Sequence, residues 1–413
     1  MEGLPKFKER EKALEDESSF EMFATRDIPV HTPSSVQHAD KDREEPRNSN
    51  RLRRLSLEVP SPRIQGSMLR VFGTDRPRIL AAALAIIFLF VLLPTRYSSQ
   101  VQIGHLFTPP VVTPRQAAAN KTLGFEKLLA LSSKPSWRTR GLQAAANLTG
   151  LEFTIPTQPH NPEELVHAFE EIGVGSGATT PKHGSATAWV AHLDLLKYII
   201  AAGFETAFIV EDDVDWDVRL KWQVQLVSDN IRNYTQVSEN DTAPYGRDWD
   251  VLWLGHCGSA IDDWVAPGLT YADKTRIATK RYVSWSTKFL KENVPEGHRH
   301  IHISTMTVCS FGYGVTKQSA QKILSLLAQG ADEAFDVALS HRCRSNELRC
   351  LVVNPQLMHH YEPPKDRGYV SPVDVGDGDG EAGNETDYES VKGTTLNIVK
   401  SARCRALFHD TCM

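Results

Sequence analysis

The 413-residue sequence has no surplus of basic residues, since 46 Lys and Arg stand against 51 Asp and Glu for a net charge of −5. This balance argues against nucleic acid as the main partner, because nucleic-acid-binding domains are strongly basic. The chain also has no visible internal repeat. With 41% hydrophobic and 23% charged residues, its overall composition is that of a globular protein.

Residues 1–77 have few apolar side chains and are dominated by charged, Ser and Pro residues. Because such a segment cannot bury enough apolar surface to fold, we predict a disordered tail. Residues 79–93 then form the longest uncharged apolar run. We predict a transmembrane helix over 78–95, although fifteen helical residues span only about 22 Å of a hydrocarbon core of about 30 Å. A buried helix of a soluble fold is the alternative.

Basic residues become scarce after this segment. Seven arginines lie between Arg51 and Arg78, whereas Arg96 stands alone for a long way after the segment. Because basic flanks stay in the cytosol, we predict a single-pass type II protein, anchored in the membrane of the Golgi apparatus or endoplasmic reticulum with its C-terminal part in the lumen. All the N-glycosylation sequons lie on that lumenal side, at Asn120, Asn147, Asn233, Asn240 and Asn384.

Cysteine is rare and absent before Cys257. An even number of cysteines in a lumenal domain favours disulfides. Nearest neighbours would pair Cys343 with Cys350 and Cys404 with Cys412, leaving Cys257 for Cys309, but fifteen connectivities are possible. Zinc binding is the alternative, and it is disfavoured because the sequence has no Cys-x-x-Cys or paired His spacing.

Residues 96–119, which contain three prolines, are typical of a stem, and we predict one folded domain over 120–413. The hydrophobic pattern predicts strands at 125–131, 249–254, 304–315 and 351–353, and helices at 141–148, 186–202 and 317–328. Residues 371–384, rich in Gly and Asp, are expected to form a loop. A helix followed by a central strand and then by a polar turn indicates an α/β domain.

The most informative stretch is 207–217, where an apolar run is followed by the five carboxylates Glu211, Asp212, Asp213, Asp215 and Asp217. The apolar half predicts a buried strand, and ligands bind beyond the C-terminal ends of strands in open α/β sheets. Because crowded carboxylates repel one another, the cluster favours a bound divalent cation. An EF-hand is excluded, because Val218 stands where its loop requires Gly. A solvated acidic turn with no role is the alternative.

Several segments together resemble glycosyltransferase family 25, the lipopolysaccharide-biosynthesis-type glycosyltransferases, and particularly the fungal branch of that family. The resemblance covers roughly residues 120–413, and the acidic block with Trp216 is its most specific part. It rests on residues 122–127, 148–151, 189, 192, 211–219, 249–258, 335–339 and 401–404. It implies a GT-A-like Rossmann-type mixed sheet flanked by helices. It also implies inverting transfer of a sugar, often galactose, from a UDP-sugar to a glycan, protein or lipid acceptor.

The resemblance also implies roles for the acidic block. Asp213 is expected to contact a divalent metal such as Mn²⁺ directly, and Asp212 and Glu211 are expected to hold the ribose or the waters of the metal. For Asp215 and Asp217, a supporting role and an acceptor-facing role fit equally.

The same resemblance implies roles for three further site residues. Asp336 is the expected base that takes the proton of the acceptor hydroxyl, although it could simply cap a helix. Arg138, expected in a loop after the first strand, would lie near the donor phosphates. His192 would lie near the nucleotide, where a packed, hydrogen-bonded role is preferred to a catalytic one. A lumenal binding or scaffolding protein and a metal-dependent phosphohydrolase remain the alternative functions.

Overall fold

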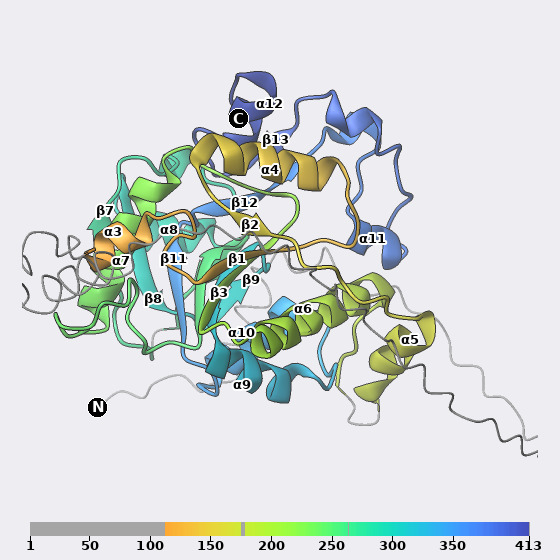
Figure 1. Ribbon diagram of the computed structural model, residues 1–413, viewed down its shortest axis with the longest axis horizontal. Helices are drawn as coiled ribbons and strands as arrows, with labels where there is room; N and C mark the ends of the chain where they lie inside the picture. The colour runs from red at the N-terminus through yellow and green to blue at the C-terminus, as the bar shows by residue number, and fades with distance from the viewer. Residues whose placement is uncertain (1–111, 175–177, 263, 413) are drawn as a thin grey trace, which may run out of the picture. The chain divides into compact units, whose positions relative to one another are not determined.

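The computed structural model describes residues 112–174, 178–262 and 264–412, which form a mixed β-sheet with helices on both faces (Figure 1). The predicted α/β class is confirmed. The predicted tail, transmembrane segment and most of the stem lie outside the described residues. Within the described ranges, no helix combines the length and apolar character needed to cross a bilayer.

The main sheet contains both parallel and antiparallel pairs, in the order β2-β1-β3-β10-β5-β11-β8-β7. β1 runs parallel to β2 and β3, and β5 runs parallel to β11, whereas β10 is antiparallel to both β3 and β5. These strands are β1 (Lys127–Leu131), β2 (Phe153–Thr154), β3 (Thr206–Glu211), β5 (Val251–Gly255), β7 (Leu269–Ala272), β8 (His298–Ile303), β10 (Gly312–Thr316) and β11 (Cys350–Asn354).

Three further strands extend the sheet beside the C-terminal end of β3. β12 (Met358–Glu362) pairs with β5, with β4 (Val214–Trp216) and with β13 (Thr394–Thr395). A separate two-stranded ribbon joins β6 (Gly258–Ala260) to β9 (Met306–Val308).

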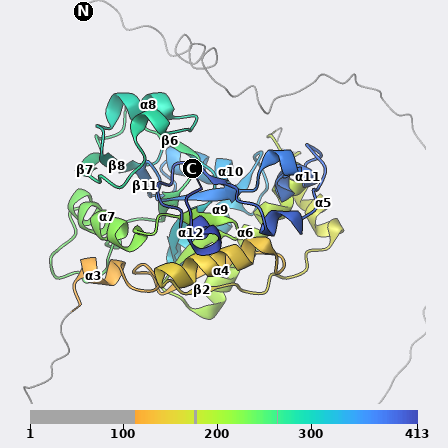
Figure 2. The same ribbon diagram turned by 90° about the horizontal axis from the view of Figure 1, so that it is seen from above.

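Alternate residues of each strand supply two separate cores. Leu128 and Ala130 pack on one face with α4 (Trp137–Thr149) and α7 (Leu220–Tyr234). Leu129 packs on the other face with α5 (Glu163–Ile172), α6 (His183–Ala202), α9 (Lys317–Leu327) and α10 (Phe335–Arg344). Figure 2 shows the same layers from above, with α12 (Ala402–Phe408) against α4. The remaining helices are α3 (Pro114–Ala118), α8 (Thr287–Asn293), α11 (Pro372–Gly376), η3 (Thr279–Arg281), η4 (Lys365–Arg367) and η5 (Asp387–Glu389).

Several predicted boundaries differ from the structure for local reasons. The strand predicted over 304–315 is two strands, β9 and β10, because Cys309 between them has a left-handed φ of 68°. The loop predicted over 371–384 contains α11, whose first residue follows the capping hydroxyl of Ser371. Within the predicted stem, α3 packs on α7 and Ala118 is fully buried, so the folded part begins by Pro114.

The three suggested disulfides are confirmed. They join Cys257 to Cys309, Cys343 to Cys350, and Cys404 to Cys412, so all six cysteines are paired. The first of these ties the end of β5 to the segment just before β10, which are 52 residues apart.

Candidate functional site

The predicted acidic cluster lies at the C-terminal end of a central strand. Residues 207–210 of β3 are fully buried, and β3 hydrogen-bonds to β1 on one side and β10 on the other. Glu211 ends this strand, and Asp212 and Asp213 form the turn into β4. The sheet therefore presents these three carboxylates at the edge where α/β proteins bind ligands.

Glu211 is held by a chain of hydrogen bonds that reaches α6. The Ser310 hydroxyl donates to Oε1 of Glu211 at 2.8 Å and lies 3.2 Å from Nε2 of His192. Nδ1 of His192 lies 3.0 Å from the Tyr313 hydroxyl. Because the Ser310 hydroxyl donates to Glu211, this hydroxyl must accept from the Nε2–H of His192, and the Tyr313 hydroxyl must then donate to Nδ1 of His192. This assignment uses one proton for each bond in the chain.

Burial shifts the pKa values of Glu211 and His192 in this series of hydrogen bonds. Burial, together with the nearby charge of Asp213, raises the pKa of Glu211 to about 8. Burial also lowers the pKa of His192 to about 3, so this imidazole is neutral at pH 7. Its ring stacks on Phe335 at 4.4 Å. His192 therefore meets the acidic turn through Ser310, as a packed and hydrogen-bonded side chain.

Asp212 and Asp213 have different surroundings. The Ser132 hydroxyl donates to Oδ2 of Asp212 at 2.5 Å, while burial and the charge of Asp213 raise the pKa of Asp212 to about 6. Asp213 keeps 14% of its side chain exposed, and its Oδ2 lies 3.8 Å from Nε of Arg138. Oδ1 of Asp213 is buried and has no hydrogen-bond partner within the described part of the chain. An unpaired buried carboxylate oxygen is costly, so this atom suits a cation.

Arg138 reaches this turn from the first turn of α4, and the prediction that it lies in a loop is wrong. The helix starts early because the Ser136 side chain accepts from the Arg138 amide at 3.1 Å, and Thr139 completes the capping box. Burial lowers the pKa of Arg138, but the charges of Asp213 and Asp212 and the contact with Tyr369 together outweigh that effect, so the pKa is raised. Its Nη1 donates to Glu385 at 3.1 Å.

Arg403 is a second buried guanidinium of the site, and no role was predicted for it from the sequence. It lies in α12, and its Nη2 donates to the backbone oxygens of Arg138 at 2.6 Å and Asp212 at 3.1 Å. Its Nε and Nη1 have no partner among the described residues. Gly141 provides the space, since a Cβ there would lie 2.6 Å from the guanidinium carbon. The only sequence signal was the 401–404 segment, which carried part of the family resemblance.

His360 is a second residue that sequence reasoning missed. It lies on β12, where its Nε2 is 2.8 Å from Oε1 of Glu362. Burial lowers the pKa of His360, but the hydrogen bond to Glu362 and the charge of Asp213 outweigh it and raise the pKa. No motif in the sequence marks His360, because only the pairing of β12 with β4 brings it to the acidic turn.

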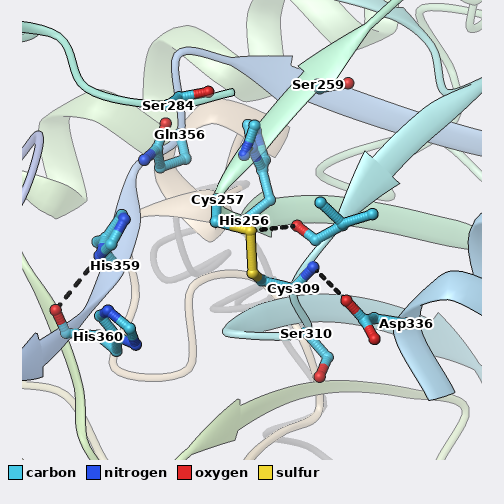
Figure 3. Close-up of a disulfide and its surroundings, with 12 residues drawn as sticks. His256, Cys257, Ser259, Ser284, Cys309, Ser310, Asp336, Gln356, His359 and His360 are labelled. Carbon is cyan, nitrogen blue, oxygen red and sulfur yellow. Dashed lines mark hydrogen bonds between the residues drawn. A yellow bond between two sulfur atoms is a disulfide. The ribbon is translucent and has the colours of Figure 1, made fainter. Parts of the chain in front are cut away.

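Asp336, the predicted base, lies in the first turn of α10. The Cys309 amide donates to its Oδ2 at 2.6 Å, and Figure 3 shows this bond beside the Cys257–Cys309 disulfide, with His360 on the other side. Because Ser310 follows Cys309 directly, consecutive residues hold Asp336 and Glu211. Burial raises the pKa of Asp336, which favours a proton acceptor. Its place in the first turn of the helix is equally that of a helix-stabilising acid.

Asp215 and Asp217 are buried against the C-terminal segment, so the acceptor-facing interpretation does not hold. Asp215 accepts from the hydroxyls of Thr395 and Ser401 and from the Arg403 amide. Asp217 accepts from the Arg219 guanidinium at 2.7 Å and from the backbone amide of residue 400 at 3.0 Å. These two carboxylates hold residues 395–403 against β4 and thereby position Arg403.

The acidic turn is not a complete metal cage made of protein. Of the described residues, one group of three potential ligands converges within 4.8 Å, and it is Glu163, His167 and His183 on α5 and α6. Oxygen-binding ions such as Mg²⁺ are usually held by one or two carboxylates together with substrate phosphates. Asp213 and Asp212 fit that kind of site, and Mn²⁺ shares the preference for oxygen ligands.

Comparison of the chain with known protein families gives no match, and comparison with curated proteins gives no match either.

Proposed function

We propose that this chain is a metal-dependent, inverting glycosyltransferase of the GT-A type. On this proposal it transfers a sugar, with galactose as the first choice, from a UDP-sugar to a glycan, protein or lipid acceptor. The tail and the apolar segment 78–95 would anchor it as a type II protein in the membrane of the Golgi apparatus or endoplasmic reticulum. The family resemblance and the sequence pattern of charges and sequons support this part of the proposal.

The buried, unpaired Oδ1 of Asp213 carries the proposal. It lies just beyond the C-terminal end of β3, between two acids whose pKa is raised. A site that raises the pKa of neighbouring carboxyls and leaves one oxygen unpaired favours binding of a cation. The two neighbouring guanidinium groups, from Arg138 and Arg403, suit an anionic partner such as a diphosphate.

Asp213 and Asp212 would hold the metal, which supplies positive charge to the donor diphosphate and to the departing nucleoside diphosphate. Glu211, fixed by Ser310, would orient the ribose or water next to that metal. Arg138 would contact the donor phosphates, because its Nε is buried and without a hydrogen bond to the described residues.

Asp336 would accept the proton of the acceptor hydroxyl. Burial raises its pKa, so it is a stronger base than an exposed aspartate. The Cys309 amide donates to Oδ2 of this carboxylate and fixes its position. His192 is not assigned to proton transfer, because its low pKa makes it a poor base and both ring nitrogens are already engaged.

One observation favours the alternative, a lumenal binding or scaffolding protein that keeps the fold. Glu385 occupies Nη1 of Arg138 and lies 3.9 Å from Lys134. A carboxylate on this guanidinium competes with a donor phosphate for the same charge. An active enzyme must therefore displace Glu385 when the donor binds.

The test measures release of UDP from a panel of UDP-sugars by the full-length protein in detergent, with and without Mn²⁺ and with mixed glycan acceptors. We expect Mn²⁺-dependent release that falls by about 100-fold in Asp213→Asn. Asp379→Asn is the matched control, because Asp379 is exposed and pairs with Lys182, away from the acidic turn. We expect this variant to keep full activity.

Two results would reject the enzyme proposal. The first is that no donor is turned over and Asp213→Asn alters neither Mn²⁺ nor UDP binding, which would favour the scaffolding alternative. The second is release of UDP at a rate that no acceptor changes, which would identify a phosphohydrolase.

A further inference from the structure

We propose a second metal site, formed by Glu163, His167 and His183, that binds a divalent transition metal of the zinc class. It lies on α5 and at the start of α6, on helices of the sheet face that does not carry α4. The proposal is independent of the proposed function, because none of its residues belongs to the acidic turn.

The three side chains converge because of simple helix geometry. Glu163 and His167 are four residues apart on α5 and share one face of that helix, and His183 is the first residue of α6. One ligand atom from each lies within 4.8 Å of the other two. Oε2 of Glu163 and Nε2 of His183 are 3.3 Å apart. Two ligands bound tetrahedrally at about 2.0–2.1 Å from zinc are separated by about 3.3 Å, so this pair already has the required spacing.

Glu170 orients both histidines for metal binding. Its Oε2 lies 3.1 Å from Nδ1 of His167, and its Oε1 lies 2.7 Å from Nδ1 of His183. When each Nδ1–H donates to this carboxylate, each Nε2 carries the lone pair that a metal needs. A carboxylate behind each metal-binding imidazole is a general feature of protein zinc sites, where it fixes the tautomer and the ring orientation.

The rest of the fold holds the two helices in place around these ligands. Phe169 of α5 packs edge-on against Trp189 of α6, with ring centroids 5.4 Å apart. The start of α6 is fixed by Asp377, which accepts from the Ser185 amide at 2.9 Å and from its hydroxyl at 2.7 Å. His183 is therefore positioned before any ion binds. This arrangement reduces the entropy cost of binding.

The ligand chemistry separates this site from the acidic turn. Two imidazoles and one carboxylate suit Zn²⁺, whereas Mn²⁺ and Mg²⁺ prefer oxygen ligands throughout. The imidazole of His167 is 63% exposed, so an ion can reach the site from solvent. A bound ion would connect α5 directly to α6 and stabilise the protein against unfolding, because it binds the folded state and the unfolded chain lacks the preformed site.

The experiment uses tag-free full-length protein in detergent that carries Asp213→Asn, so that the acidic turn does not contribute. Zn²⁺ is titrated against a chromogenic chelator, and Co²⁺ is used to detect the visible absorption of imidazole-bound metal. We expect one Zn²⁺ per chain. Affinity should fall at least 10-fold in His167→Gln and in His183→Gln, and 10- to 100-fold in Glu170→Gln.

His341→Gln is the matched control. His341 is an exposed histidine of α10, 59% exposed, whose Nδ1 lies 2.6 Å from Asp332, but it is not part of a three-ligand group. Its replacement should leave Zn²⁺ affinity unchanged. Because His167 is similarly exposed, His167→Gln should fold normally, and unchanged tryptophan fluorescence would establish that its loss of affinity is local.

The proposal is wrong if the Asp213→Asn protein binds no Zn²⁺, or if His167→Gln and His183→Gln bind it as tightly as the parent. Equal affinity for Mn²⁺ and Zn²⁺ would also contradict it. The two proposals fail separately. In the chain with Asp213 intact, His167→Gln should leave UDP release unchanged, while an inactive enzyme would still bind Zn²⁺ at this site.

Discussion

The raised pKa of Glu211 predicts how the stability of the protein depends on pH. The pKa is about 8 in the folded protein against an ordinary value of 4.5 for glutamate, mainly because the side chain is buried. In the folded state Glu211 therefore keeps its proton at pH values where the unfolded chain has lost it. The contribution of Glu211 to the free energy of unfolding has its full value below pH 4.5 and is lost as the pH rises through 8.

The magnitude follows from linkage. When the folded state holds one more proton than the unfolded chain, the free energy of unfolding falls by about 1.4 kcal/mol for each unit that the pH rises. Between about pH 5.5 and pH 7.5 the folded protein holds nearly one extra proton on Glu211. The wild type should therefore lose about 2.5 kcal/mol more stability over this interval than Glu211→Gln, which cannot titrate but still accepts from Ser310.

The assay is urea unfolding in the presence of EDTA, followed by tryptophan fluorescence. All eight tryptophans lie between Trp137 and Trp285, so the signal reports the folded part even in the full-length chain. The difference between variants isolates Glu211, because the buried histidines contribute equally to both. Glu205→Gln, at the other end of β3 and 81% exposed, should behave as wild type.

The argument from burial is refuted if wild type and Glu211→Gln lose the same stability between these pH values. It is equally refuted if the wild type gains stability relative to the variant as the pH rises. Either result would mean that Glu211 is solvated or paired with a cation in the folded protein.

Three other sets of changes test contacts in the structure. Glu385→Gln weakens a competitor of the donor phosphates, so it should tighten UDP binding several-fold in calorimetry, whereas Glu389→Gln, in the same segment, should not. Cys257→Ser should cost about 4 kcal/mol and Cys343→Ser about 2 kcal/mol in chemical denaturation, because their disulfides close segments of 52 and 7 residues. Asp215→Ala should lower the free energy of unfolding by about 3–5 kcal/mol, because it leaves four buried donors unpaired, and Asp215→Asn should cost less.

The sequence was sufficient for features that depend on local pattern. The apolar run 207–210 predicts β3, and the charges after it predict a polar turn. Both predictions depend only on the change from apolar to charged residues within a few positions. The position of Arg138 was missed because a capping box at Ser136 outweighed the weak hydrophobic pattern of that segment. His360 and Arg403 could not be predicted, because strand pairing and helix packing bring them to the site from far along the chain.

The structure also shows that fewer of the five clustered carboxylates need a bound cation than the sequence suggests. Asp215 accepts hydrogen bonds from hydroxyls and an amide, and Asp217 pairs with Arg219, so neither requires a metal. Glu211 retains a proton up to about pH 8, and Ser310 satisfies one of its oxygens. A cation at Asp213 would favour the charged form of Glu211 and lower its pKa. Metal binding at neutral pH must then release a proton, and the affinity for metal must rise with pH until Glu211 is ionised.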